Sequence, residues 1–282
     1  MNAPEHRYDA VAQASAAQVI AGYSTSFGWA TRLLAQPVRT HVRNIYALVR
    51  VADEIVDDPD PALAASWREQ QLDALEAETY RAMASTRSAN LVVHAFALTA
   101  RRYGIRRELV EPFFASMRAD LVRSQHDVQS LSAYVHGSAE VVGLMCLRVF
   151  VGGDDATYER LRPGAQRLGA AFQKVNFLRD LADDHDQLGR TYFPGLDPVA
   201  FSDAHRDELL DDIDADLAAA AEAIRQLPDS SRRAVRAAHA LYSALSRRLR
   251  STPAARIRQA RIRVPDGQKA LIVMRALAGR AG

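Results

Sequence analysis

Apolar residues recur at helical spacing along most of this 282-residue chain. Alanine, leucine, arginine and glutamate, all strong helix formers, are abundant, whereas alternating β-branched stretches bounded by turn residues are almost missing. Breakers divide the chain into pieces of mostly helical length, and they lie at 36–37, 58–61, 85–90, 103–104, 151–154, 194–198, 228–230, 253 and 265–267. The pattern predicts an all-α protein.

Prolines and serines predict where three of these helices begin. Pro37 lies near the start of a helix that runs to about residue 57, and Ser130 and Ser132 can cap the helix that holds 134–150. Pro163 fits the first turn of a helix that runs to about residue 185. These segments are apolar on several sides, which is typical of helices inside a bundle. Without an internal repeat or a flexible linker, the sequence predicts one domain over 1–282, a bundle of about ten helices.

Composition narrows the class of protein. Thirty-six basic and 34 acidic residues give a net charge of only +2, and the single cysteine, Cys146, excludes an internal disulfide. The longest apolar runs are far shorter than a membrane-spanning helix, and the N-terminus lacks the pattern of a secretory signal. We therefore expect a cytoplasmic protein.

The first chemically informative cluster lies at the end of the helix that follows Pro37. Asp53 and Asp57 are four residues apart, so both carboxylates lie on one helix face, about 6 Å apart along its axis. Arg50 precedes Asp53 by three residues, and the apolar neighbour Ile55 indicates that this helix packs against the protein interior. Two such carboxylates repel each other unless a cation lies nearby. The alternative is a solvated helix end.

A second cluster repeats this arrangement. Asp180 and Asp184 are again four residues apart, Asn176 lies one turn earlier, and Gln173 lies beside it. Arg179 adjoins Asp180, as Arg50 adjoins Asp53. Hard oxygen ligands of this kind suit Mg²⁺, which binds one or two carboxylates together with substrate phosphates. Two such faces across a cavity would hold metal ions and a diphosphate, whose oxygens the two arginines can meet.

Other chemistries fit the sequence less well. A di-iron centre needs Glu-x-x-His pairs on facing helices, and the histidines are scattered singly, as expected for structural or surface positions. Cys146 lies in an apolar helix and is expected to serve packing rather than nucleophilic catalysis. The arginine-rich C-terminal fifth could be a nucleic-acid arm. Its interleaved Leu, Ile and Val favour instead a packed helix with a basic outer face that touches anionic lipid.

Several motifs together resemble the squalene/phytoene synthase family, the head-to-head branch of the all-α prenyl diphosphate synthases. The motifs occur in the family's order over nearly the whole chain, and the chain most resembles bacterial phytoene synthases. Its segments are 23–27 (Tyr-Ser-Thr-Ser-Phe), 46–57, 117–120 (Met-Arg-Ala-Asp), 134–143, 173–184, 189–194 and the arginine-rich tail through Lys269. The resemblance implies a single-domain isoprenoid synthase bundle with a central cavity.

The resemblance also implies a reaction. Two prenyl diphosphates condense through a cyclopropylcarbinyl diphosphate, with two geranylgeranyl diphosphates giving phytoene for carotenoid biosynthesis as the first choice. Two farnesyl diphosphates giving dehydrosqualene or squalene are the alternative, and NADPH is required only if squalene forms. A non-catalytic assembly-factor relative is a further alternative, which the presence of all four aspartates weakens.

Site residues carry over by position. The metal ligands implied for Mg²⁺, with Mn²⁺ as a substitute, are Asp53, Asp57, Asn176, Asp180 and Asp184. The catalytic set implied comprises the four aspartates with Arg50, Tyr46 and Tyr134, and the substrate-binding set comprises Ser24, Ser26, Phe27, Arg50, Gln173, Asn176, Arg179, Arg190, Tyr192 and Tyr242. Asp120 matches a further family acid but ranks lower, because Arg118 and Arg123 could pair with it.

Two departures from the family pattern are visible. Tyr23 and Thr25 stand where a histidine and a basic residue are common, so one diphosphate contact must come from elsewhere. Glu140 stands where glycine is usual, and a buried glutamate is costly unless it is protonated or paired. We expect it to pair with an arginine or to face outward in a shifted register.

Such apolar substrates partition into membranes. The expected partners are therefore prenyl diphosphates and the inner face of the plasma membrane as a peripheral contact, without nucleic acid.

Overall fold

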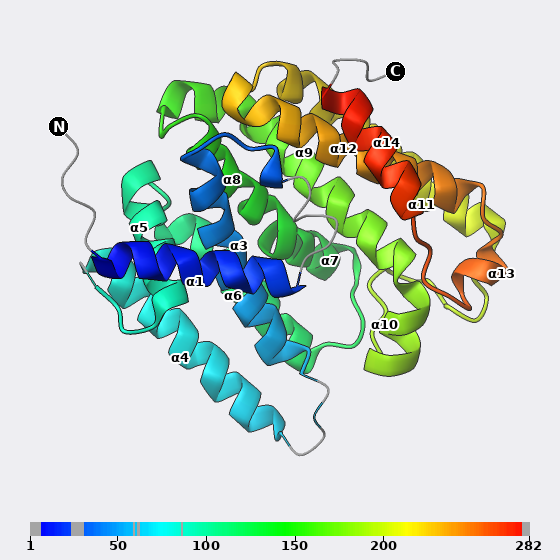
Figure 1. Ribbon diagram of the computed structural model, residues 1–282. Helices are drawn as coiled ribbons and strands as arrows, with labels where there is room; N and C mark the ends of the chain where they lie inside the picture. Colours follow the sequence, from blue (N-terminus) through cyan, green and yellow to red (C-terminus); the bar gives the residue numbers. More distant parts are fainter. Residues whose placement is uncertain (1–6, 24–30, 59, 61–62, 86, 278–282) are drawn as a thin grey trace.

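The computed structural model describes residues 7–23, 31–58, 60, 63–85 and 87–277, and among these it contains helices and no strand. The prediction of an all-α fold is confirmed (Figure 1). The α-helices are α1 (Arg7–Tyr23), α3 (Val38–Val56), α4 (Ala65–Ala84), α5 (Leu91–Tyr103), α6 (Arg107–Val122), α7 (Val128–Val135), α8 (Val141–Phe150), α9 (Asp155–Arg179), α10 (Leu181–Leu188), α11 (Asp203–Arg225), α12 (Asp229–Arg250), α13 (Ala254–Ile257) and α14 (Asp266–Leu277).

Helix α3 follows Pro37 as the sequence predicts. Its buried apolar residues recur every three or four positions, from Val38 and Val42 to Ala52 and Val56, so one side of the helix faces the core. The helix ends at Asp57, whose backbone N–H still donates to the carbonyl of Asp53 at 2.9 Å. This last turn keeps the two aspartates on the same side of α3.

Helix α9 differs from the sequence-based expectation at both ends. It begins at Asp155, where the Asp154 side chain accepts the backbone N–H of Thr157, so Pro163 lies inside the helix rather than in its first turn. It stops at Arg179, and Asp180 joins it to α10 with a non-helical ψ of 9°. Asp180 and Asp184 therefore do not lie on one continuous helix, although the N–H of Asp184 still donates to the carbonyl of Asp180 at 2.9 Å.

The segment between α7 and α8 is a π-helical turn, η1 (His136–Glu140), which the sequence pattern did not predict. Ser130 serves in a capping box with Asp127 at the start of α7, so the helix begins earlier than the predicted cap. Gly169 of α9 packs directly on η1, because an added Cβ would lie 2.8 Å from the carbonyl oxygen of Ala139. The wide turn thus fits against α9 only with glycine there.

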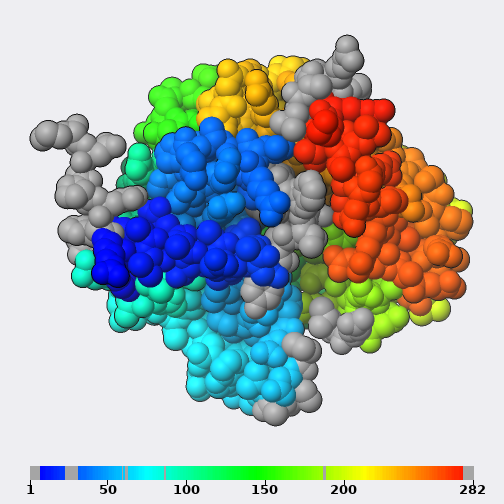
Figure 2. Space-filling view, viewed as in Figure 1, coloured from blue at the N-terminus to red at the C-terminus, as the bar shows by residue number. Residues whose placement is uncertain are grey.

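Two large apolar clusters lie on either side of the molecule. One gathers α3, α4, α5, α6 and α8, and the other gathers α7, α9, α11, α12 and α13. Helices α9 and α11 pack along each other, and α14 runs back along α12 at the surface (Figures 1 and 2). No helix within the described part of the chain has the length and apolar character needed to cross a membrane. One domain over 1–282 remains a prediction.

Candidate active site

A cavity of about 720 Å³ lies between the two clusters, within the range of ligand pockets. Helices α3, α8, α9, α11 and α12 contribute to its wall, and α9 contributes the longest part. Between Leu161 and Phe177, the α9 residues of the wall follow one helical stripe with spacings of three and four, and they are Leu161, Gly164, Ala165, Leu168, Gly169, Phe172, Gln173, Asn176 and Phe177. The stripe changes from apolar at its start to polar at its end.

The first predicted carboxylate pair lies at the polar end of this cavity. Asp53 and Asp57 both line it, and so does Arg50. Arg50 forms its close ion pair with Glu54, one turn along α3, while its guanidinium lies 4.0 Å from the Asp53 carboxylate. A cationic group thus stands beside the pair at the cavity wall.

The second pair approaches from the junction of α9 and α10. The Arg179 guanidinium binds both oxygens of Asp180, with Nε donating at 2.8 Å and a terminal nitrogen at 2.5 Å. Arg261, from the segment between α13 and α14, places its Nε 2.9 Å from Oδ1 of the same carboxylate. Asp184 lines the cavity one turn further along the chain. Asp180 is thus held by two arginines from distant parts of the sequence.

Arg190 connects the elements that carry these aspartates. One terminal nitrogen donates to Asp57 at 2.8 Å, and the other donates to the backbone carbonyl of Asp120 at 3.1 Å. The loop that carries Arg190 is fixed beside α6, because the N–H of Thr191 donates to the carbonyl of Ser124 at 2.8 Å. This one guanidinium therefore joins α3 and α6 to the segment that follows α10.

Three carboxylates at this end, Asp53, Asp120 and Asp184, have pKa values above that of a free aspartate. Burial, followed by the neighbouring Asp57, raises the pKa of Asp53 to about 7. Burial, followed by the neighbouring Asp180, raises the pKa of Asp184 to about 7. Burial also raises the pKa of Asp120 to about 7, against the opposing effect of Arg190. Burial and neighbouring carboxylates thus disfavour the charged forms of these three aspartates, and a bound cation would favour them.

The donor set fits a hard divalent cation in pairs rather than as one cluster. Within the described ranges, no three His, Cys, Asp or Glu residues come together closely enough to hold a metal ion. Each aspartate pair supplies only part of an octahedral shell, which suits Mg²⁺ because this ion keeps water and phosphate oxygens as its other ligands. Asn176, the fifth predicted ligand, lines the cavity and accepts the Tyr242 hydroxyl at 3.4 Å.

Aromatic rings form the wall beside the aspartates. The Tyr134 hydroxyl donates to Asp120 at 2.8 Å, and the Tyr134 ring lies 5.4 Å from that of Tyr192. Tyr192 in turn stacks on Phe177, with centroids 4.0 Å apart. Burial raises the pKa of both tyrosines, so both keep their protons at neutral pH. The electron-rich faces of these rings can stabilise a cation in the cavity.

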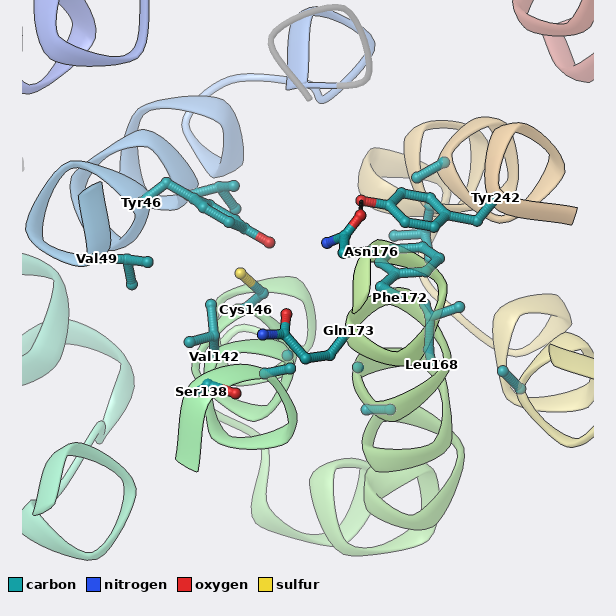
Figure 3. A pocket seen from close by; sticks show the side chains of 18 of the residues that line it. Tyr46, Val49, Ser138, Val142, Cys146, Leu168, Phe172, Gln173, Asn176 and Tyr242 are labelled. Atoms are coloured by element: carbon teal, nitrogen blue, oxygen red, sulfur yellow. Dashed lines mark hydrogen bonds between the residues drawn. The ribbon is translucent and has the colours of Figure 1, made fainter. Parts of the chain in front are cut away.

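The middle of the cavity is shown in Figure 3. Tyr46 from α3 points across the space towards Gln173 and Asn176 from α9, and Cys146 from α8 lies below it. Burial raises the pKa of the Cys146 thiol to about 12, so the group remains a thiol at neutral pH. On the opposite side Tyr242 stacks on Phe172 with centroids 3.8 Å apart (Figure 3).

The structure brings most of the sequence-predicted residues to this one cavity. Those that line it are Tyr46, Arg50, Asp53, Asp57, Tyr134, Gln173, Asn176, Arg179, Asp180, Asp184, Arg190, Tyr192 and Tyr242. Ser24, Ser26 and Phe27, predicted to cover the diphosphates, lie outside the described residues.

The sequence alone does not reveal the place of two residues of the cavity, Asp120 and Arg261. Asp120 ranks below the four aspartates in the sequence because Arg118 and Arg123 could pair with it, but Arg118 binds Asp73 and Glu76 instead, and the Tyr134 hydroxyl donates to Asp120. Arg261 had been counted among the basic tail, because nothing in its local sequence indicates that it reaches Asp180. The basic excess is also spread over α12, α13, α14 and their connections rather than one helix.

Glu140 finds neither an arginine partner nor an outward position. Its carboxylate lies 2.9 Å from Nδ1 of His136 and accepts the amide of Gln166 at 3.2 Å. The π-helical turn does shift the register here, as the expectation of an outward-facing Glu140 assumed. Glu140 nevertheless remains part-buried and contacts His136 and Gln166. Other histidines make local contacts, such as His41 with Thr99 at 3.0 Å and His239 with the carbonyl of Leu217 at 2.9 Å.

Comparisons with known proteins now bear on this geometry. Residues 20–268 match the family model described as squalene/phytoene synthase. This chain belongs to the squalene/phytoene synthase family. The family comprises prenyltransferases of the phytoene and squalene synthase type, which carry out head-to-head prenyl condensation and use Mg²⁺.

Individual relatives agree with the family assignment. The chain is 30% identical over 246 residues to the 15-cis-phytoene synthase of Paracoccus sp., covering 80% of this chain and 78% of that one. It is 31% identical over 187 residues to the 15-cis-phytoene synthase of Pantoea ananas, covering 64% of this chain and 58% of that one. A crystal structure of a dehydrosqualene synthase superposes with a TM-score of 0.79 at 18% identity, covering 96% of this chain and 97% of that one. The isoprenoid synthase fold of the family is therefore confirmed.

Proposed function

We propose that this protein is an Mg²⁺-dependent prenyltransferase that joins two geranylgeranyl diphosphates head to head to form phytoene. The observation that carries the proposal is the arrangement of two aspartate pairs with Arg50, Arg179, Arg190 and Arg261 at one end of an otherwise apolar cavity. The relatives named as phytoene synthases support this choice of substrate and product.

At the polar end, the chain binds and orients the diphosphates. Asp53, Asp57, Asn176, Asp180 and Asp184 are the residues that would hold Mg²⁺, and the bound ion would neutralise charge that develops on the departing diphosphate oxygens. The guanidinium groups that now pair with the aspartates are placed to bind the same oxygens. The bound cation and the guanidinium groups are both needed, because the departing diphosphate takes the electron pair of the broken carbon–oxygen bond and gains negative charge.

In the rest of the cavity, the chain shelters a carbocation. Departure of one diphosphate leaves an allyl cation, which the double bond of the second substrate attacks; loss of a proton then gives the cyclopropylcarbinyl diphosphate. Loss of the second diphosphate, rearrangement and loss of another proton give phytoene. The rings of Tyr46, Tyr134 and Phe177 face this space and can each stabilise a nearby cation by about 0.5 to 2 kcal/mol. The apolar wall excludes water, which would otherwise capture the cation.

Product analysis tests the proposal directly. Purified protein with Mg²⁺ and geranylgeranyl diphosphate should yield phytoene without NADPH, and removal of Mg²⁺ by EDTA should stop the reaction. Absence of any condensed product from either geranylgeranyl or farnesyl diphosphate would overturn it.

Condensation of two farnesyl diphosphates is the second candidate. The structural likeness to a dehydrosqualene synthase over nearly the whole chain favours it. Parallel assays with farnesyl diphosphate, with and without NADPH, separate the outcomes, because dehydrosqualene forms without a reductant and squalene requires one.

We also propose that the protein works in the cytoplasm and contacts an anionic membrane through α14. Two large apolar side chains project from the outer side of this helix, Leu271 with 49% and Met274 with 65% of their surfaces exposed. The segment 244–277 contains nine Arg or Lys residues and one acidic residue, Asp266, so the surroundings are basic. Vesicles with anionic lipid should retain the protein, and Leu271→Ser with Met274→Ser should weaken retention, whereas Val199→Ser at another exposed position should not.

A further inference from the structure

Three arginines gather where α3 begins. Arg39 and Arg43 are four residues apart on α3, so their side chains leave the same face of the helix, and Arg32 lies in the segment 31–37 that leads into it. Nε of Arg39 donates to the carbonyl of Leu34 at 2.9 Å, which holds this guanidinium beside the segment. The chain from residue 31 onwards, drawn in mid-blue in Figure 2, reaches the surface next to α1. We call Arg32, Arg39 and Arg43 the arginine cluster.

Arg43 has like charges as its neighbours. Burial, followed by the charges of Arg39 and Arg32, lowers the pKa of Arg43, and within the described part of the chain no carboxylate is among the groups that act on it. Its Nε is buried and has no hydrogen-bond partner among the described residues. A buried N–H donor without an acceptor is unfavourable. This nitrogen therefore calls for an acceptor from outside the described chain.

The sequence on either side of the cluster adds no compensating negative charge. Residues 24–30, which lead to the cluster, include no Asp or Glu. On the other side, the N–H of Ala35 donates to the carbonyl of Ser230 at 3.0 Å, so the start of α12 lies against the segment 31–37. Residues 229–236 of that helix contain three arginines and one aspartate. The surroundings of the cluster are thus basic, which favours an anion as its ligand.

The cluster is separate from the aspartates of the cavity. Arg43 and Asp53 are ten positions apart on α3, which is about 15 Å along the helix. Arg50, by contrast, forms its close ion pair with Glu54, and Arg190 binds Asp57. The arginines beside the aspartates therefore have acidic partners in the fold, and those of the cluster are three to four turns away from them.

We propose that the arginine cluster binds a phosphate or diphosphate group, with Nε of Arg43 among the donors. A guanidinium presents several N–H donors in a fixed plane, and phosphate oxygens accept such pairs of hydrogen bonds well. The site is distinct from the one proposed for condensation, and the inference does not depend on that reaction. The same chemistry is offered by free pyrophosphate and by the headgroup of an anionic lipid, which the experiment separates.

Arg43→Gln is the test variant, and Arg106→Gln is its matched control. Each change removes one guanidinium without breaking an ion pair among the described residues, but Arg106 is exposed in the turn between α5 and α6. Arg43→Lys keeps the charge and removes the Nε donor, and it serves as the test if Arg43→Gln does not fold. Thermal unfolding identifies any variant that fails to fold.

The free anion is tested by isothermal titration calorimetry with inorganic pyrophosphate in the presence of EDTA. Without a metal the aspartates repel this anion, so the titration favours sites made of arginine. Arg43→Gln should weaken binding about 10-fold or more, because a charge-assisted pair of hydrogen bonds is lost. Arg43→Lys should weaken it less, and Arg106→Gln should leave it unchanged.

The lipid headgroup is tested by flotation with phosphatidylcholine vesicles, with and without phosphatidic acid. Weaker pyrophosphate binding in Arg43→Gln identifies a free phosphate or diphosphate as the ligand. Weaker retention confined to vesicles with phosphatidic acid identifies a lipid headgroup, and either result supports the site. Binding and retention that are both unchanged in a folded Arg43 variant, or that fall equally in Arg106→Gln, would overturn the proposal.

Discussion

The two ends of the cavity differ in what holds them together, although α9 contributes to both. The carboxylate end comprises Asp53, Asp57, Asp120, Asp180 and Asp184, and there burial, followed by neighbouring carboxylates, raises the pKa values of Asp53 and Asp184. The apolar end is lined by Leu147, Phe150, Leu161, Ala165, Ala223 and Leu227, and there Leu147 and Leu161 are buried against carbon with 2% of their surfaces exposed. The carboxylate end is arranged to bind a ligand and lowers the stability of the fold. The apolar end stabilises the fold and limits the shape of the ligand that can bind.

The largest effect that can test this contrast is expected from Asp53→Asn. The change removes a charge needed for substrate and metal binding, so turnover should fall about 10³-fold. The same change relieves repulsion with Asp57, so the melting temperature without Mg²⁺ should stay level or rise by about 1 to 2 °C.

Steady-state kinetics and thermal unfolding, measured on the same preparation, check both results. Asp73→Asn is the control, because this aspartate pairs with Arg118 outside the cavity and should leave turnover near the wild-type level. A marked loss of stability in Asp53→Asn without Mg²⁺ would contradict the contrast.

The next largest effect is expected from Leu147→Ala at the apolar end. Truncating this buried side chain should lower the free energy of unfolding by about 2 to 4 kcal/mol, because its contacts in the apolar cluster are lost. Turnover per folded molecule should change only a few-fold. Denaturant unfolding and kinetics distinguish this pattern from that of Asp53→Asn, and an unchanged unfolding free energy would argue against tight packing around Leu147.

A smaller effect is expected from Arg190→Lys. Lysine keeps the charge but cannot reach Asp57 and the carbonyl of Asp120 with separate nitrogens, so turnover should fall about 30-fold. Arg162→Lys serves as the control, since Arg162 pairs with Glu159 on the exposed side of α9. If both variants kept full activity in steady-state assays, Arg190 would be excluded as a bidentate group.

The smallest effect concerns pH and Mg²⁺. The folded pKa of about 7 for Asp53 and Asp184 exceeds the ordinary value of 3.8, so their contribution to stability is present below pH 4 and lost as the pH rises through 7. A bound cation replaces the protons, so Mg²⁺ with pyrophosphate should raise the melting temperature by a few degrees more at pH 8 than at pH 6. Thermal unfolding in the two buffers measures the difference, which Asp53→Asn with Asp184→Asn should abolish.

Much of the site could be predicted because its residues lie at helical spacing within short segments. Asp53 and Asp57 share one face of α3 by virtue of a four-residue interval, and the interval alone places them there. Asp180 and Asp184 were identified by the same interval, although the helix breaks between them. Side chains that act through long-range contacts could not be found this way, and Arg261 is the example, since it lies 81 positions after Asp180 in the sequence.

The sequence by itself determined the helical class, the two aspartate pairs and the family, because periodicity and local motifs are properties of neighbouring residues. Only the tertiary structure decided which arginine meets which carboxylate, why Glu140 pairs with His136 across a π-helical turn, and which helices line the cavity. These depend on how helices from distant segments pack, and packing is set by the whole set of side chains at each interface rather than by any single stretch of sequence.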